Sequence, residues 1–376
     1  MSTRILHIQK CAGVGGAEKH LSLLLPELVK AGYEVHYLIA EPPNAVKLND
    51  SFISSLLDKG VHCHRVRLKS DLSPIGLGIL FKIIRNLNPH ILHSHLIQGD
   101  LYGALYKTLF PKMILVSTRH GYDEVYQAKF DLSPDRVHDY KNIYYWLSRF
   151  AAHKSSGLIG ISHGISRLLS AILRDSSKVK TIWYGYESRK VIPISEKPSY
   201  LYYIGRLIPF KYPGDLISAY VLYRQMGGCL PLKIAGSGED EAGMKIQLRA
   251  SAYEADVEFL GRIPNPEAYL FEAACLCVSS HSEGFGLVAL EAMNAGLPIL
   301  AYDVPALNEI VVSGETGILC PKGDVIAFAK GMLAFEKDAG MRTTLGAAGK
   351  RRLEEIFTIS EMVSKTSNLY DSLVGN

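Results

Sequence analysis

The sequence SEGFGLVALEAMNAGLP, residues 282–298, joins a glycine-rich turn to a helix and carries two carboxylates eight residues apart. Glu283 falls in the turn, just before Gly284 and Gly286, and Glu291 falls in the helix. The glycines allow a ligand to approach the backbone closely. The N–H groups at the start of the helix favour an anionic ligand, and the carboxylates accept hydrogen bonds from hydroxyls. The stretch therefore predicts a site for a ligand with phosphates and hydroxyls, as in a nucleotide-sugar.

The same order of strand, turn and helix repeats along the chain on both sides of this stretch. Residues 185–199 interrupt it with prolines, charges and serines and are typical of a linker between domains. Alternating strands and helices indicate parallel sheets covered on both faces. We expect an α/β protein of two Rossmann-like domains facing across a cleft. The expected strands are 4–8, 35–39, 62–66, 91–94, 113–118, 157–161 and 179–183, then 200–205, 231–235, 257–260, 276–279, 298–302 and 318–320.

Composition excludes several classes of protein. The chain has 376 residues, of which 48% are hydrophobic and 21% charged, which fits a packed protein rather than a disordered one. It has no apolar run long enough to span a membrane, and its start does not resemble a signal peptide. Six scattered cysteines argue against a disulfide scaffold and for a reducing cytoplasm. A net charge of +4 permits weak attraction to anionic lipid, and no nucleic-acid motif is present.

Two further glycine turns follow predicted strands. Gly13, Gly15 and Gly16 follow the first strand and could cradle a phosphate, although their spacing does not fit the dinucleotide pattern G-x-G-x-x-G. Gly236 and Gly238 follow the strand at 231–235 and could add backbone N–H groups to the same rim. The alternative for each turn is structural, because any tight strand-to-helix turn favours glycine.

Cations stand at the end of the first strand of the second domain. Arg206 follows Gly205, and Lys211 lies five residues further on. Two cations there suit a diphosphate that leaves with negative charge, although either could be a solvated surface residue. Arg262 could lie over a flat base, and a surface position is an equal alternative.

The histidines give a second set of polar candidates. His93 and His95 lie at one strand end, but metal binding needs a third ligand that the sequence does not show, so hydrogen bonding or packing is favoured. His120 ends the next strand, where it could bond a sugar hydroxyl. Residues 122–152 interleave aromatic and cationic side chains, which suits an amphiphilic acceptor or a membrane interface; a helix packed on its own domain is slightly favoured.

These motifs, in this order, resemble the retaining glycosyltransferases of family four, which have the GT-B fold. The resemblance spans nearly the whole chain, and its most specific element is the E-x7-E block from Glu283 to Glu291. It implies an acceptor-binding N-terminal domain at 1–190, a donor-binding C-terminal domain at 191–357, and a C-terminal helix at 358–376 that packs back on the first domain.

The resemblance also implies residue roles. The catalytic residues would be Arg206, Lys211, Glu283 and His120. The donor would be bound by Gly15, Gly16, Gly205, Gly236, Gly238, Arg262, Gly284, Phe285, Gly286, Leu287 and Glu291. In that scheme the two cations hold the diphosphate, Glu291 accepts the ribose hydroxyls, and Glu283 and His120 lie against the donor sugar.

The expected reaction is transfer of a hexose or N-acetylhexosamine, with retention and without a metal or other cofactor, from a nucleoside diphosphate sugar to a glycan or lipid-linked acceptor. UDP and GDP donors both fit, and UDP is preferred. The expected location is the cytoplasm, with peripheral contact at the inner membrane surface. A nucleotide-sugar 2-epimerase of the same fold and a non-catalytic nucleotide-sugar-binding protein remain as alternatives.

Overall fold

The computed structural model describes residues 2–11, 13, 15–43, 46–68, 70, 73–122, 137, 139, 142–188 and 197–375. The chain divides into two compact units. Unit 1 comprises Met1–Gly185 together with Ile359–Asn376, and unit 2 comprises Tyr186–Thr358. The segment predicted as a linker, 185–199, lies partly outside the described residues. None of the helices in the described part of the chain is long and apolar enough to span a membrane.

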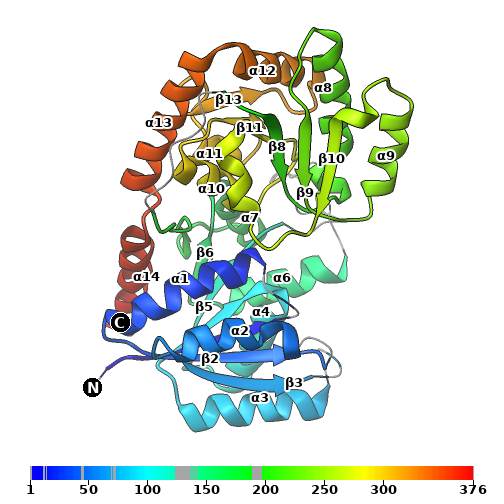
Figure 1. The fold of residues 1–376 in the computed structure, drawn as a ribbon. Coiled ribbons are helices and arrows are strands. Elements are labelled where there is room, and N and C mark those ends of the chain that lie inside the picture. Colours follow the sequence, from blue (N-terminus) through cyan, green and yellow to red (C-terminus); the bar gives the residue numbers. More distant parts are fainter. Residues whose placement is uncertain are drawn as a thin grey trace. The chain divides into compact units, whose positions relative to one another are not determined.

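Unit 1 contains a parallel sheet, as predicted (Figure 1). Its strand order in the described residues is β3-β2-β1-β4-β5-β6-β7. The strands are β1 (Arg4–Lys10), β2 (Glu34–Glu41), β3 (His62–Arg67), β4 (Ile91–His95), β5 (Ile114–Arg119), β6 (Gly157–Gly160) and β7 (Val179–Thr181). Side chains alternate between the two faces because the period of a strand is two: Ile5 packs into one core cluster and Leu6 into the other.

Helices cover both faces of this sheet. Helices α1 (Gly16–Lys30), α2 (Val46–Leu57) and α14 (Ile359–Val374) pack on the Ile5 face. Helices α3 (Pro74–Leu87), α4 (Leu96–Leu109) and α6 (Ile143–Lys154) pack on the Leu6 face, and α7 (His163–Leu173) packs beside α6. The final helix, α14, lies against α1 (Figure 1), so the chain returns to unit 1 for its last element.

Unit 2 repeats the architecture with a second parallel sheet, in the order β10-β9-β8-β11-β12-β13. Its strands are β8 (Tyr200–Ile204), β9 (Leu232–Ala235), β10 (Val257–Gly261), β11 (Ala273–Val278), β12 (Ile299–Tyr302) and β13 (Gly317–Cys320). β11 is buried along its whole length. Because both faces of a central parallel strand are covered, its sequence is continuously apolar rather than alternating.

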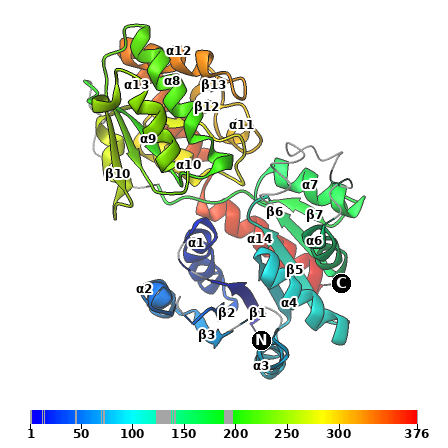
Figure 2. The same ribbon diagram turned by 90° about the vertical axis from the view of Figure 1, so that its right-hand side faces the viewer.

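The helices of unit 2 form two layers (Figure 2). α8 packs against α9 and α12, while α10 packs against α13. The elements are η2 (Pro209–Lys211), α8 (Pro213–Gln225), α9 (Glu241–Arg249), η3 (Glu254–Asp256), η4 (Pro266–Glu272), α10 (Leu287–Ala295), α11 (Leu307–Ile310), α12 (Val325–Lys337) and α13 (Ala339–Ile356). The segment 266–272 is a 3₁₀ helix. Pro266 stands at its N-terminus, and 3₁₀ geometry is common in short connectors.

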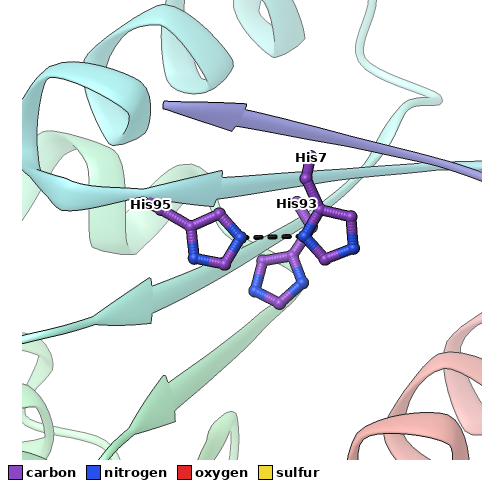
Figure 3. Close-up of side chains that lie close together, drawn as sticks. All are labelled: His7, His93 and His95. Carbon is purple, nitrogen blue, oxygen red and sulfur yellow. Dashed lines mark hydrogen bonds between the residues drawn. The ribbon is translucent and has the colours of Figure 1, made fainter. Parts of the chain in front are cut away.

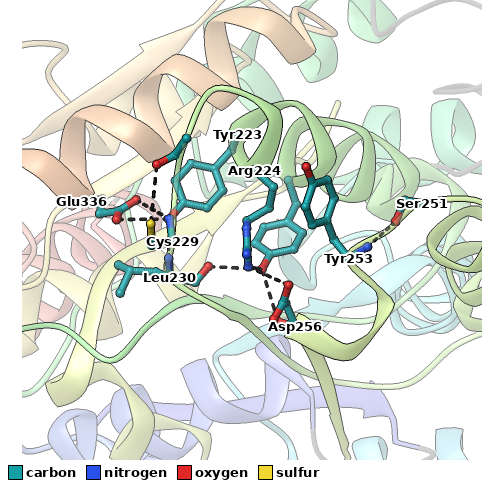
Figure 4. Close-up of polar contacts among 10 residues, drawn as sticks. Tyr223, Arg224, Cys229, Leu230, Ser251, Tyr253, Asp256 and Glu336 are labelled. Carbon is teal, nitrogen blue, oxygen red and sulfur yellow. Dashed lines mark hydrogen bonds and ion pairs between the residues drawn. The ribbon is translucent and has the colours of Figure 1, made fainter.

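A polar network closes the amino-terminal edge of the sheet in unit 2 (Figure 4). The backbone N–H of Cys229 donates to both carboxylate oxygens of Glu336, at 3.2 and 3.1 Å. The Tyr223 hydroxyl donates to the same carboxylate and accepts from the N–H of Leu230 at 2.8 Å. These bonds tie the turn after α8 to α12. They lie at the edge opposite the loops that carry the candidate site.

Candidate functional site

The strand order locates a switch point in each sheet. In unit 1, β1 lies between β2 and β4, and in unit 2, β8 lies between β9 and β11, so successive crossovers leave the central strand in opposite directions. Ligands of doubly wound sheets bind beyond the carboxyl ends of the strands at such a point. In unit 2 the loops after β8 and β11 carry Arg206, Lys211 and Glu283.

Lys211 and Glu283 form an ion pair between these two loops. Lys211 ends the short helix η2, and Glu283 follows β11 in a position where it is only 8% exposed. The Ser280 hydroxyl donates to the same carboxylate oxygen at 2.8 Å, and the Ser279 hydroxyl donates to the backbone carbonyl of Lys211 at 3.2 Å. A buried carboxylate needs a cation and hydrogen bonds, so each side chain fixes the position of the other.

A second tie between the loops was not predicted. Tyr212 has a left-handed backbone (φ 45°), and its ring stacks on that of His281, with centroids 3.4 Å apart and planes 6° from parallel. His281 Nε2 lies 2.8 Å from an Asp215 carboxylate oxygen, which also accepts from the Tyr302 hydroxyl at 3.2 Å. Nothing in the sequence pairs these residues, although His281 stands at a strand end, as His120 does.

A pocket of about 300 Å³ borders this tie. It is lined by Pro209, Tyr212, Pro213, Gly214, Asp215, Asp240, Gly243, Met244 and Gln247. The lining contains two carboxylates and no cation. Its chemistry therefore does not suit a diphosphate, and the cations Arg206 and Lys211 are not part of its wall.

Gly236 and Gly238 pack the turn after β9 directly on the loop after β8. A Cβ on Gly236 would lie 1.8 Å from the carbonyl oxygen of Gly205, and one on Gly238 would lie 2.0 Å from that of Leu207. Gly236 also has φ 148°. The amides of Gly205 and Gly236 already donate to Ala235 and Gly261. These glycines therefore serve close backbone packing, which places the loop that carries Arg206.

The E-x7-E block begins the helix α10. Gly286 precedes the helix with φ 103°, where glycine carries no steric cost, and Leu287 begins it. The Phe285 ring is buried and meets the Phe357 ring edge to face, which fixes the turn between Glu283 and the helix. Glu291 lies in the second turn of the helix and is 4% exposed.

The remaining two cations of the predicted site are exposed. The Arg206 guanidinium lies 5.5 Å from the centre of the Phe210 ring, in the loop that leads to Lys211. Arg262 follows β10 and is also exposed.

In unit 1, Glu18 organises the Gly15–Gly16 turn. Its carboxylate accepts the Gly15 N–H at 2.8 Å, forming a capping box at the start of α1, and its other oxygen accepts from the Gln9 amide. The Tyr37 hydroxyl donates to Gln9 at 3.1 Å. The turn is thus held from inside by the buried Glu18 carboxylate, a role that the sequence does not predict.

His120 lies at the carboxyl end of β5, half-buried, with both ring nitrogens hydrogen-bonded. Its Nε2 lies 2.9 Å from His95 Nδ1, and its Nδ1 lies 2.5 Å from the Tyr184 hydroxyl. His95 Nε2 in turn lies 2.8 Å from His7 Nδ1. Burial lowers the pKa of His120 and His95 well below the ordinary value, so both are neutral near pH 7.

His7, His93 and His95 lie close together on β1 and β4, with nitrogens within 4.8 Å of one another (Figure 3). Their rings are tilted or stacked, at interplanar angles of 10–34°. His93 Nε2 bonds the Thr118 hydroxyl at 2.7 Å, and His93 Nδ1 bonds the Tyr370 hydroxyl. Stacked rings do not point their in-plane lone pairs at one centre, so the cluster suits hydrogen bonding, as predicted for His93 and His95, better than a metal.

The site residues therefore fall into two groups. The structure brings Lys211 and Glu283 together in unit 2, and it joins His120 to a buried histidine cluster in unit 1. Most of the predicted residues 122–141 lie outside the described part of the chain. Their continuation, α6, buries Tyr145 and exposes Ile143 and Trp146.

Comparison with known proteins gives matches over nearly the whole chain. Residues 14–189 match the family described as glycosyltransferase family 4, and residues 186–352 match glycosyl transferases group 1. N-acetyl-alpha-D-glucosaminyl L-malate synthase of Bacillus anthracis is 24% identical, over 95% of this chain and 94% of that relative. The capsular polysaccharide biosynthesis glycosyltransferase CapM of Staphylococcus aureus is 22% identical, over 92% of both chains.

Solved structures show the same fold. HepE of Anabaena, solved with UDP and glucose, has a TM-score of 0.80 at 16% identity. The match covers 98% of this chain and 100% of the HepE chain. The lipopolysaccharide outer core galactosyltransferase WaaB has a TM-score of 0.76 at 18% identity, and the match covers 98% of this chain and 99% of the WaaB chain. These neighbours support the GT-B class of fold predicted from the motifs.

Proposed function

Because the chain belongs to family four of the glycosyltransferases, we propose that it is a retaining, metal-independent enzyme that transfers a hexose or N-acetylhexosamine from a UDP-linked donor. The observation that carries the proposal is the Lys211–Glu283 ion pair beyond the carboxyl ends of β8 and β11. It holds an ammonium in a fixed position at the switch point of the sheet. The HepE neighbour, solved with UDP-glucose, supports a uridine donor.

The acceptor we propose is a glycan or a lipid-linked saccharide in cell-surface polysaccharide or glycolipid synthesis. The support comes from the printed roles of similar proteins: CapM acts in capsular polysaccharide biosynthesis, and WaaB in the lipopolysaccharide outer core. The exposed side chains of Ile143 and Trp146, the latter 54% exposed, support a peripheral contact with a membrane surface. Loss of binding to anionic vesicles in Trp146→Ala would support that contact, and unchanged binding would contradict it.

In the proposed mechanism the charge of the leaving diphosphate is stabilised by Lys211 and Arg206. These cations act most strongly as the sugar–phosphate bond breaks, when negative charge grows on the leaving group. Glu283 orients the ammonium and meets the sugar. Glu291 and the backbone of residues 284–287 hold the ribose and the sugar hydroxyls, Gly16 approaches the diphosphate, and Arg262 frames the base. The two glutamates are binding groups and not an acid–base pair of the glycosidase kind.

The test measures donor kinetics in three variants. Lys211→Ala is expected to lower kcat by about 10²–10³-fold, the usual effect of removing one group that stabilises transition-state charge. Glu291→Ala is expected mainly to raise the KM for the donor. Lys245→Ala removes a comparable lysine on α9, paired with Glu241, and serves as the control. Unchanged kinetics in both site variants would refute the assignment, and loss of activity on chelator treatment would refute metal independence.

Two alternatives make different predictions with the donor alone. A nucleotide-sugar 2-epimerase would invert C2 of the donor sugar in the absence of any acceptor. A non-catalytic binding protein would bind the donor without transfer or hydrolysis against a broad acceptor panel. The presence of Arg206, Lys211, Glu283 and Glu291 together favours the transferase.

A further inference from the structure

A chain of three hydrogen bonds runs through the buried interior of unit 1. It links His7 Nδ1 to His95 Nε2 at 2.8 Å, His95 Nδ1 to His120 Nε2 at 2.9 Å, and His120 Nδ1 to the Tyr184 hydroxyl at 2.5 Å. His7, His95 and Tyr184 are buried, whereas His120 is half-buried. The chain therefore reaches the surface of unit 1 at His120, the residue assigned above to the donor sugar.

Both links between histidines join an Nδ1 to an Nε2, and this restricts which nitrogens carry the protons. A neutral imidazole carries one N–H and one acceptor nitrogen. If His95 carries its proton on Nδ1, it donates to His120 Nε2, and His120 must then carry its own proton on Nδ1. His95 Nε2 is then an acceptor, so His7 must also carry its proton on Nδ1. Starting from Nε2 on His95 places all three protons on Nε2 by the same reasoning.

We propose that His95, held by His7, is a positioning residue that sets the ring plane and the tautomer of His120. This inference rests on the proposed function for its link to the donor sugar.

Burial supports neutral rings. It lowers the pKa of His7 to about 3 and the pKa of His95 and His120 well below the ordinary value. At the inner end, His7 Nε2 is buried with no hydrogen-bond partner among the described residues. An unpaired donor there is disfavoured more than an unpaired acceptor, so the arrangement with all protons on Nδ1 is the expected one.

The first test needs no variant and no activity. Histidine labelled with ¹⁵N gives different shifts for protonated and bare ring nitrogens, and couplings across N–H···N bonds identify the linked rings. We expect His7, His95 and His120 to carry their protons on the same type of nitrogen. A mixed set, such as Nδ1–H on His95 with Nε2–H on His120, would overturn the proposal. A protein without transferase activity would still give this result, so failure of the proposed function is distinguishable.

The second test uses two matched variants of one residue. The amide of asparagine falls near the position of histidine Nδ1, and that of glutamine falls near Nε2. His95→Asn therefore keeps a partner for His120, and His95→Gln keeps a partner for His7. We expect His95→Gln to lower kcat by about five- to tenfold, as for one lost hydrogen bond, and to change the His120 nitrogen shifts. His95→Asn should retain most of the kcat and leave the His120 nitrogen shifts close to those of the unchanged protein. Equal loss in the two variants, or unchanged His120 shifts in His95→Gln, would overturn the proposal.

Discussion

The rings of Tyr212 and His281 stack with centroids 3.4 Å apart, and this contact joins the loop that ends in Lys211 to the loop that carries Glu283. Tyr212 adopts φ 45° to reach it, a conformation that costs a non-glycine residue on the order of 1–2 kcal/mol. A strained residue persists only where its surroundings hold it in place, and His281 with Asp215 provides that restraint.

His281→Ala is therefore expected to destabilise unit 2 by about 1–2 kcal/mol, since it removes both the stack and the bond to Asp215. The loop would then hold Lys211 less firmly, and the donor KM should rise severalfold. Chemical unfolding and donor kinetics measure the two effects. His163→Ala, an exposed histidine of unit 1, is the control and should change neither.

The Lys211–Glu283 pair should show energetic coupling. Removing either charge leaves the other without its ion-pair partner in a mostly buried position, so the double variant Lys211→Ala/Glu283→Ala should be less destabilised than the sum of the single variants. We expect a coupling of about 1–3 kcal/mol in a double-mutant cycle on the unfolding of unit 2. The partly exposed pair Lys245–Glu241 on α9, with side chains 43% and 29% exposed, is the reference, with about 0.3–0.5 kcal/mol. Equal coupling in the two pairs would contradict the structural role assigned to Glu283.

Two glycine-to-alanine substitutions test whether the close backbone contact at Gly236 requires glycine. Gly236→Ala would bring a Cβ to 1.8 Å from the Gly205 carbonyl oxygen, and neither backbone can move without displacing β8 or β9. We expect a loss of about 3 kcal/mol or more, or a protein in which unit 2 does not fold. Gly243→Ala, inside α9 with no atom within 4 Å of the new Cβ, should instead stabilise the protein by about 0.5–1 kcal/mol. Thermal melting of the two variants decides the matter.

Acid should destabilise unit 1 before it protonates the buried histidines. The pKa of His7 and of His20 is lowered from 6.5 to about 3 in the folded protein. Between these values the unfolded chain binds protons that the folded chain does not, so stability is complete above about pH 6.5 and falls as the pH decreases toward 3. In that window each of the two histidines lowers the free energy of unfolding by about 1.4 kcal/mol for each unit by which the pH decreases.

Hydrogen exchange of the β1 and β4 amides between pH 7.5 and 5 measures this loss once the intrinsic exchange rates are corrected. His20→Leu should reduce the slope of stability against pH by about one proton. A free energy of unfolding that does not change between pH 7.5 and 5 would show that the histidines are already charged in the folded state.

The sequence predicts the elements better than it predicts their contacts. Periodicity and glycine turns locate α8 and α10 and the strands before them, because these signals are local. Lys211 and Glu283 are each predictable from a motif, but their ion pair depends on β8 and β11 being neighbours in the sheet. His7 was not singled out at all, since its place beside His93 follows only from the register of β1 with β4. The stack of Tyr212 on His281 likewise depends on a backbone conformation with no sequence signal.

The return of α14 to unit 1 has a consequence for the order in which the protein matures. Met362, Leu369 and Tyr370 belong to the core on the α1 face, and Tyr370 also bonds His93. All residues of unit 2 are synthesised before this helix emerges from the ribosome. Unit 2 therefore has its complete sequence first, while the earlier-made unit 1 must wait with an uncovered apolar face for the last segment of the chain. Nascent unit 1 is consequently the part most exposed to chaperones and to aggregation.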